Sequence, residues 1–189
     1  SNDEHVLESN PENLRSNSAV ILDSHGQATL MPQQRTLGLI WDPNDDHFKF
    51  STSMLDSELK PTKRNMLRQV MLVFDPLGFL ACFSITARII LQDVWRTGIG
   101  WDDELPASLD QRWKQWCGEL HHVTSVKIPR CYLPECANDG RPELHLFCDA
   151  SEKAYAAVAY FRFPEAASVS STFVAAKARV SPLKPVSIP

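Results

Sequence analysis

Residues 60–101 read KPTKRNMLRQVMLVFDPLGFLACFSITARIILQDVWRTGIGW, and they predict two amphipathic helices joined by a tight turn. Pro61 suits the first turn of the first helix, because its missing N–H would have no partner there. Apolar residues then recur at i, i+3, i+4 and i+7, which is the spacing of one helix face. The face predicted to be buried consists of Leu67, Val70, Met71 and Phe74.

The turn and the second helix follow directly. The tetrapeptide Asp-Pro-Leu-Gly at 75–78 favours a type I turn. Ser84 is a suitable cap for the free N–H groups at the start of the second helix. Gly98 and Gly100 are expected to end this helix, because glycine accepts a left-handed backbone. Its predicted buried stripe consists of Ala87, Ile90, Leu91, Val94 and Trp95.

The first helix carries a cationic face. Lys60, Arg64 and Arg68 repeat every four residues, and residues 60–100 hold six Lys or Arg against two Asp or Glu. The whole chain has a net charge of −4 and a pI near 5.8, which argues against a stand-alone nucleic-acid-binding protein. Two interpretations of this local positive charge are open. The helix either contacts phosphates or has a solvated basic face, through Lys63, Arg64 and Arg68.

The composition is that of an ordinary globular protein. The 189 residues are 43% hydrophobic and 22% charged, which suffices for one sizeable core or two small ones. Five cysteines at irregular spacing do not form a disulfide framework and favour a reducing compartment. No apolar run approaches the roughly 20 residues of a membrane span, so we expect no membrane partner. The chain begins without methionine and stops in mid-pattern, so we expect a fragment.

Residues 36–51, TLGLIWDPNDDHFKFS, predict a β-hairpin. Pro-Asn-Asp-Asp at 43–46 has strong turn chemistry, and Phe48 and Phe50 alternate on the return strand. Gly38 lacks a Cβ and would let a backbone approach a phosphate closely. In a plain surface hairpin the same glycine would be a bulge.

A third helix is predicted at 106–121, after an acidic loop at 101–106 that is expected to cap it. Its tryptophans are expected to be core residues rather than a stacking platform for bases. A short strand at 123–130 and a linker at 129–142 follow. The apolar face of the helix consists of Leu109, Trp113, Trp116, Cys117 and Leu120.

Three strands are predicted near the end of the chain, at 144–151, 154–163 and 172–180. Their short connections favour an antiparallel meander. The first strand ends in Asp149, followed by Ala-Ser. Taken alone, an aspartate at this position is commonly a turn residue.

The segments TKRNMLRQVMLVFDPLGFL (62–80) and ITARIILQDVWRTGIGWDDELP (85–106) resemble the Pao/BEL family of retrotransposon polyproteins. The resemblance extends from about residue 13 to the last residue. It implies an α+β segment that follows the reverse transcriptase palm and leads into ribonuclease H. The expected parts are an irregular segment (1–35), a primer-grip-like hairpin (36–58), a helical thumb or connection unit (59–122), a strand and linker (123–142) and a truncated ribonuclease-H-like start (143–189).

The resemblance also implies site residues. Leu37, Gly38 and Leu39 would contact the primer backbone, and Lys63, Arg64 and Arg68 would contact phosphates. Asp149 would be the first of the acidic residues that hold two divalent metals, with Mg²⁺ as the expected cofactor of the complete polyprotein. Two-metal cleavage needs several carboxylates around ions about 3.5–4 Å apart, and the next acidic residue of the family is expected beyond Pro189.

The implied partners are an RNA/DNA hybrid or template–primer and the rest of the Pol polyprotein. The fragment is expected to be catalytically inactive by itself. It lacks the remaining carboxylates of the ribonuclease H site, and it lacks the polymerase aspartate pair. The resemblance implies that its parent is an RNA-directed DNA polymerase and ribonuclease H. The expected location is the cytoplasm, within a virus-like particle, with the nucleus as the alternative.

Two other functions are open at this point. The family is often labelled a peptidase, peptidase A17, but an aspartic protease needs an Asp-Thr/Ser-Gly turn. The chain offers Asp23-Ser24-His25 and Asp139-Gly140, and neither fits. A domesticated protein-interaction module would use the tryptophan-rich helices, and exposure of Trp113 or Trp116 would favour it.

Overall fold

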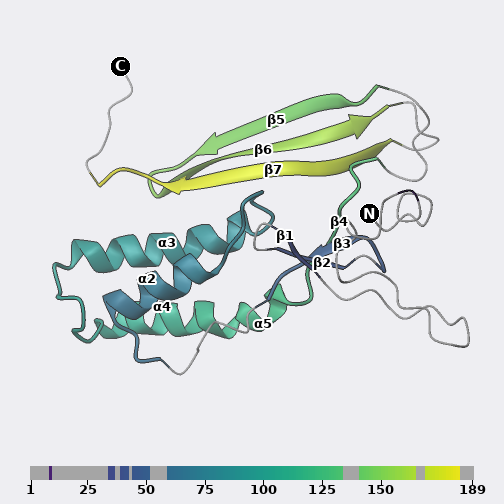
Figure 1. Ribbon diagram of the computed structural model, residues 1–189. Coiled ribbons are helices and arrows are strands. Elements are labelled where there is room, and N and C mark those ends of the chain that lie inside the picture. The colour runs from purple at the N-terminus through teal and green to yellow at the C-terminus, as the bar shows by residue number, and fades with distance from the viewer. Residues whose placement is uncertain are drawn as a thin grey trace, which may run out of the picture.

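The computed structural model describes residues 9, 34–36, 39–42, 44–51, 59–133, 141–164 and 169–183. These residues form the predicted α+β fold. A helical unit and a small sheet lie on one side of a long, three-stranded sheet (Figure 1).

The helical unit contains α2 (Lys63–Leu72), α3 (Ala81–Arg96), α4 (Ala107–Gly118) and the single turn α5 (Leu120–Val123). Helix α3 contacts both α2 and α4, and the three share one apolar core. The predicted face of the third helix is confirmed, with Cys117 only partly buried. The core consists of Met66, Val70, Ala87, Ile90, Leu91, Val94, Leu109, Trp113, Trp116 and Leu120.

The buried face of α2 differs from the predicted one. Met66 is fully buried and Val70 nearly so, whereas Met71 is 72% exposed and Phe74 is 52% exposed. The helical period is satisfied equally well by positions 63, 66 and 70, and packing against α3 selects this set. The helix is capped by the Thr62 hydroxyl, which accepts the Asn65 N–H at 3.3 Å, so Pro61 precedes the cap.

Helix α3 begins at Ala81, earlier than the predicted Ser84. The carboxylate of Asp75 accepts the N–H groups of Phe79 at 2.9 Å and Leu80 at 2.7 Å, so it fixes the turn that leads into α3, and the helix itself has no side-chain cap. Four residues of the predicted stripe are buried, but Trp95 is 45% exposed because it covers a side chain of α2 instead. Gly98 has φ +74°, as expected of a residue that ends a helix.

The small sheet has the order β1-β2-β3-β4 and is antiparallel throughout. It comprises β1 (Gln34–Thr36), β2 (Leu39–Asp42), β3 (His47–Lys49) and β4 (Lys127–Pro129). The predicted hairpin is confirmed, with Trp41 opposite Phe48. The predicted strand at 123–130 is shorter, because Val123 still belongs to α5.

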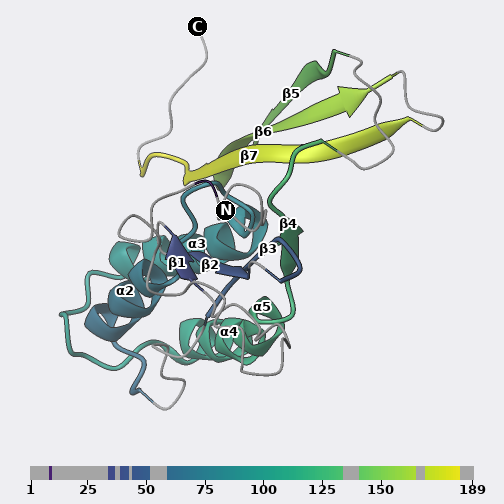
Figure 2. The same ribbon diagram turned by 45° about the vertical axis from the view of Figure 1, so that its right-hand side comes forward.

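The long sheet is the predicted meander. It comprises β5 (Glu143–Ala150), β6 (Ala154–Phe163) and β7 (Ser170–Val180), antiparallel in the order β5-β6-β7. The register between β6 and β7 shifts at Ala159 and Tyr160. Figures 1 and 2 show that one face of this sheet turns toward α3, while the other face turns away from the helices.

The turn before α3 joins the helical unit to the long sheet. Gly78 has φ +78°, and a Cβ at this position would lie 1.9 Å from the carbonyl oxygen of Ala176 in β7. Ala176 N–H donates to the Leu77 carbonyl at 2.8 Å, and the Phe79 and Phe173 rings lie 5.1 Å apart. Glycine at 78 is therefore required both by its backbone conformation and by the close approach of β7.

Candidate nucleic-acid interface

The predicted placement of Lys63 on an open cationic face is wrong. Lys63 is only 6% exposed, and its ammonium donates to the Ile99 carbonyl. The ammonium also lies 4.7 Å from the centre of the Trp95 ring and 6.0 Å from that of Trp101. A cation held in this way stabilises the protein, and it leaves little of Lys63 accessible to a phosphate.

Arg64 is exposed but engaged. Its Nε and Nη2 donate to the two carboxylate oxygens of Asp102 at 2.8 and 2.9 Å. This bidentate pair raises the pKa of Arg64 and lowers the pKa of Asp102. Lys60 pairs with Glu104 at 2.8 Å in the same loop. The loop at 101–104 therefore neutralises the start of α2.

This acidic loop was expected to cap α4, and that expectation is wrong. Helix α4 follows Pro106 and has no side-chain cap. Asp103 instead accepts the Gly100 N–H at 2.6 Å, which closes the loop on itself. The carboxylates bind α2 and the loop itself, because the loop folds back on α2. The centre of the Trp101 ring lies 5.7 Å from the guanidinium carbon of Arg64.

Arg68 differs from its two neighbours. It is exposed, and it has no hydrogen bond or ion pair with any side chain in the part of the chain that the structure describes. Of the three predicted phosphate contacts on α2, Arg68 is the one whose guanidinium is open to a ligand in this arrangement.

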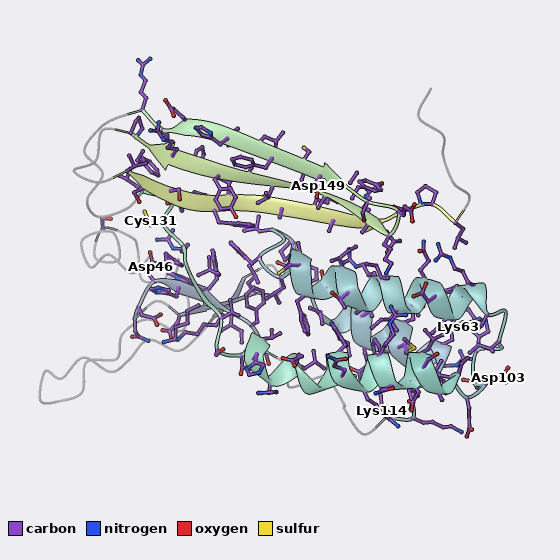
Figure 3. All side chains as sticks on the ribbon, turned by 180° about the vertical axis from the view of Figure 1, so that it is seen from behind. Asp46, Lys63, Asp103, Lys114, Cys131 and Asp149 are labelled. Atoms are coloured by element: carbon purple, nitrogen blue, oxygen red, sulfur yellow. The ribbon has the colours of Figure 1, made fainter. Side chains whose placement is uncertain are left out.

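Asp149 is exposed at the end of β5, and one of its oxygens accepts the Ala150 N–H at 2.8 Å. It borders a hollow of about 450 Å³ between the long sheet and the start of α3, together with Phe79 and Cys82. Figure 3 shows Asp149 on the long sheet and Lys63 near the outer end of the helices. Lys63 borders neither of the two hollows that Asp149 borders, so the structure does not bring these two residues together.

Asp149 does not form a metal site with other described side chains. Within the described ranges, no group of three or more His, Cys, Asp or Glu residues could hold a metal ion. A two-metal centre needs several convergent carboxylates. The residues that the structure describes therefore do not fit a complete Mg²⁺ site, and no reaction step can be derived from them.

The primer-grip residues are only partly placed. Leu37 and Gly38 lie outside the described residues, so their predicted contacts stay predictions. Leu39 is 2% exposed and packs with Phe50, Leu80 and Val123. Its side chain belongs to a core, so a ligand could reach only its backbone.

The two alternative functions depend on particular aspartates and tryptophans. Asp23-Ser24-His25 and Asp139-Gly140 lie outside the described residues. Trp113 and Trp116 are each 4% exposed and stack on one another at 4.9 Å, as expected of core residues. The exposure that would have favoured an interaction module through these tryptophans is therefore not found.

Two further exposed cations lie on the long sheet, outside the predicted site. Lys177 and Arg179 on β7 are exposed, and neither has a partner among the side chains that the structure describes. A signal for them exists in the sequence, because residues two apart on a strand lie on the same face.

The described helices are followed by an antiparallel meander whose first strand ends in an exposed aspartate, and this α+β fold is compatible with an RNaseH-like domain. The family model described as the Pao retrotransposon-like RNaseH-like domain matches residues 62–189. The chain belongs to this family and is part of a Pao retrotransposon Pol polyprotein, as its motifs predicted. No curated protein matches the sequence. Among the described helices, none combines the length and the apolar character needed to cross a membrane.

Proposed function

We propose that this chain binds an RNA/DNA hybrid as the thumb or connection of the reverse transcriptase and the opening strands of ribonuclease H, and that it does not cleave the hybrid alone. The observation that carries this proposal is the exposed carboxylate of Asp149 at a strand end, beside a hollow between the long sheet and the start of α3. Membership in an RNaseH-like family supports it.

The cationic contribution from α2 is narrower than the sequence suggested. Arg68 is free for a phosphate, and Arg64 could exchange Asp102 for one, because both members of that pair are more than 60% exposed. Exposed ion pairs contribute little stability, so such an exchange costs little. Lys63 has a structural role in this proposal.

We extend the proposal to the cofactor and the location. In the complete polyprotein, Asp149 would be one of the carboxylates that hold Mg²⁺, and the metal would supply the chemistry of two-metal phosphodiester cleavage. The further carboxylates would have to come from residues beyond those described. The compartment would be the cytoplasm, within a virus-like particle, or the nucleus.

Fluorescence anisotropy with a labelled, blunt-ended RNA/DNA hybrid tests the proposal at several salt concentrations. We expect the double variant R64A/R68A to weaken binding and to reduce the slope of log affinity against log salt by about 1–2, because each lost phosphate contact removes about 0.9. The matched control R112A/K114A removes two exposed cations of α4 and should leave the slope unchanged. Equal affinities of the wild type and R64A/R68A would refute the proposal.

A further inference from the structure

The face of the long sheet that turns away from the helices carries its own cluster of side chains. Strand alternation and register put Lys177 and Arg179 on this face, with Ala157 opposite Lys177 and Tyr155 opposite Arg179. On the next strand, Cys148 pairs with Ala157 and Ala150 pairs with Tyr155. These residues border a hollow of about 520 Å³. We refer to Tyr155, Lys177 and Arg179 with this hollow as the outer patch.

The two cations of the outer patch are not neutralised. Both are exposed, and neither forms an ion pair or hydrogen bond with a described side chain. Asp149 also borders the hollow. It pairs with Ala156, and strand alternation places both residues on the opposite face of the sheet from Lys177 and Arg179. The Asp149 Oδ1 accepts the Ala150 N–H at 2.8 Å, within its own strand end. An anionic ligand is the complement that these charges call for.

The uncharged part of the outer patch favours nucleic acid over an acidic peptide. Tyr155 is 44% exposed directly opposite Arg179, so an aromatic ring and a cation stand side by side. The floor beside them consists of small residues, Ala150, Ala157 and Cys148, over which a flat ring can lie. Exposed aromatic rings beside phosphate-binding cations are the arrangement by which proteins hold unpaired bases.

We infer that the outer patch binds single-stranded nucleic acid, with Lys177 and Arg179 on successive phosphates and Tyr155 stacked on a base. Two residues apart on one strand, the two cations are separated by about 6.6 Å, which is comparable to the phosphate spacing of an extended strand. Leu144 and Leu146, 64% and 65% exposed on the same face, continue the surface beyond the cations. This site is distinct from the proposed hybrid contacts on α2.

Anisotropy with labelled oligo(dT) and oligo(U) on the full chain tests the inference. We expect K177A/R179A to weaken single-strand binding at least tenfold and to reduce the salt slope by about 1.4, which is two contacts of about 0.7 each. Y155A should weaken binding about five- to a hundredfold, whereas Y155F, which keeps the ring, should bind like the wild type. All of these side chains are exposed, and thermal unfolding would verify that the variants fold.

Two controls separate this inference from the proposed function. R64A/R68A should leave single-strand affinity unchanged, and K177A/R179A should leave affinity for a blunt-ended hybrid within about twofold. Unchanged single-strand binding by K177A/R179A would overturn the inference. It would also be overturned if R112A/K114A lost as much affinity, or if Y155A had no effect and polyglutamate competed as well as the oligonucleotides.

Discussion

Lys63 shows why a residue's charge does not determine its place. Its position on α2 lies on the same face as Met66 and Val70, so its aliphatic stem is buried with them. The long side chain then carries the ammonium past the core to the Ile99 carbonyl and the Trp95 ring. Without these partners a buried cation would be strongly unfavourable. The fold therefore depends on this lysine, which looked like a surface residue.

Replacing Lys63 by Ala should lower the free energy of unfolding by about 1.5–3 kcal/mol, because a hydrogen bond to a charged group is lost and the Ile99 carbonyl is left unpaired. Urea denaturation followed by tryptophan fluorescence measures the change. Arg68→Ala is the control on the same helix and should change stability by less than about 0.5 kcal/mol. Equal stability of the two variants would contradict the structural role of Lys63.

Asp46 and Arg130 give a pH-dependent prediction. Arg130 donates to both oxygens of Asp46, at 2.7 and 2.9 Å, and this hydrogen bonding lowers the pKa of Asp46 in the folded protein. A lowered pKa means that the stabilisation is present above the usual range of an aspartate and is lost as pH falls below about 4. Asp46 has φ +51°, which asparagine also tolerates, so Asp46→Asn isolates the charge.

We expect D46N to lose about 1 kcal/mol of stability at pH 7, a value discounted because the pair is partly exposed, and to match the wild type near pH 2. Denaturation curves at several pH values measure the difference. In a double-mutant cycle with R130A the two losses should not add. A difference between wild type and D46N that does not change with pH would rule out the ion pair as its cause.

At the level of elements, the turn at 75–80 has two functions. Asp75 accepts the N–H groups of Phe79 and Leu80, the two residues just before α3, and burial of this carboxyl raises its pKa in spite of those hydrogen bonds. Gly78 meanwhile brings the backbone against β7. A motif that reads as a simple helix stop is thus also the junction between the helices and the long sheet.

Gly78→Ala should destabilise the protein by about 2–4 kcal/mol, because it adds a steric clash with the Ala176 backbone to the cost of a left-handed conformation. Gly98→Ala is a matched control, since Gly98 has a similar φ of +74° and no atom lies within 4 Å of the position that its Cβ would take. It should cost about 1–2 kcal/mol. Thermal or urea unfolding gives both values, and equal losses would show that the contact with β7 is unimportant.

Across the whole molecule, one ring connects the two sheets. Phe79 lies 6.4 Å from Phe48 and from Phe50, which belong to the small-sheet region, and 5.1 Å from Phe173 in β7. Side-chain amides add further links, such as Gln92, which donates to the Ser181 carbonyl at 2.6 Å. The helical unit, the small sheet and the long sheet are therefore packed against each other through Phe79 and α3.

Phe79→Ala should lower stability by about 2–4 kcal/mol, because a half-buried aromatic contact to both sheets is removed. Hydrogen exchange should show reduced amide protection in β3 and β7 together. Phe74→Ala, at a residue that is 52% exposed nearby, should change protection little. Loss of protection in only one of the two strands would contradict a shared junction.

Much of this architecture is predictable because it depends on local patterns. The short connections between the strands in residues 143–180, the hairpin around its turn, and the helical periods near Ala87 and Trp113 each specify an element without help from the rest of the chain. The site was predictable only in part. The position of Asp149 follows from a motif, but the occupation of Lys63 and Arg64 by partners 36 and 38 residues away does not.

The amino-acid pattern thus specifies the elements, their order, the family and the exposed aspartate, since these follow from periodicity, turn chemistry and motif. Which cations remain open to a ligand is settled by packing, because the loop after α3 folds back on α2 and turns two of its charges to the protein's own groups. The same packing sets β7 against α3 and leaves Lys177 and Arg179 exposed on the other face of the long sheet. A charge is most available for binding where tertiary contacts leave it without a partner, and a paired charge such as Arg64 is available only by exchange with an exposed partner.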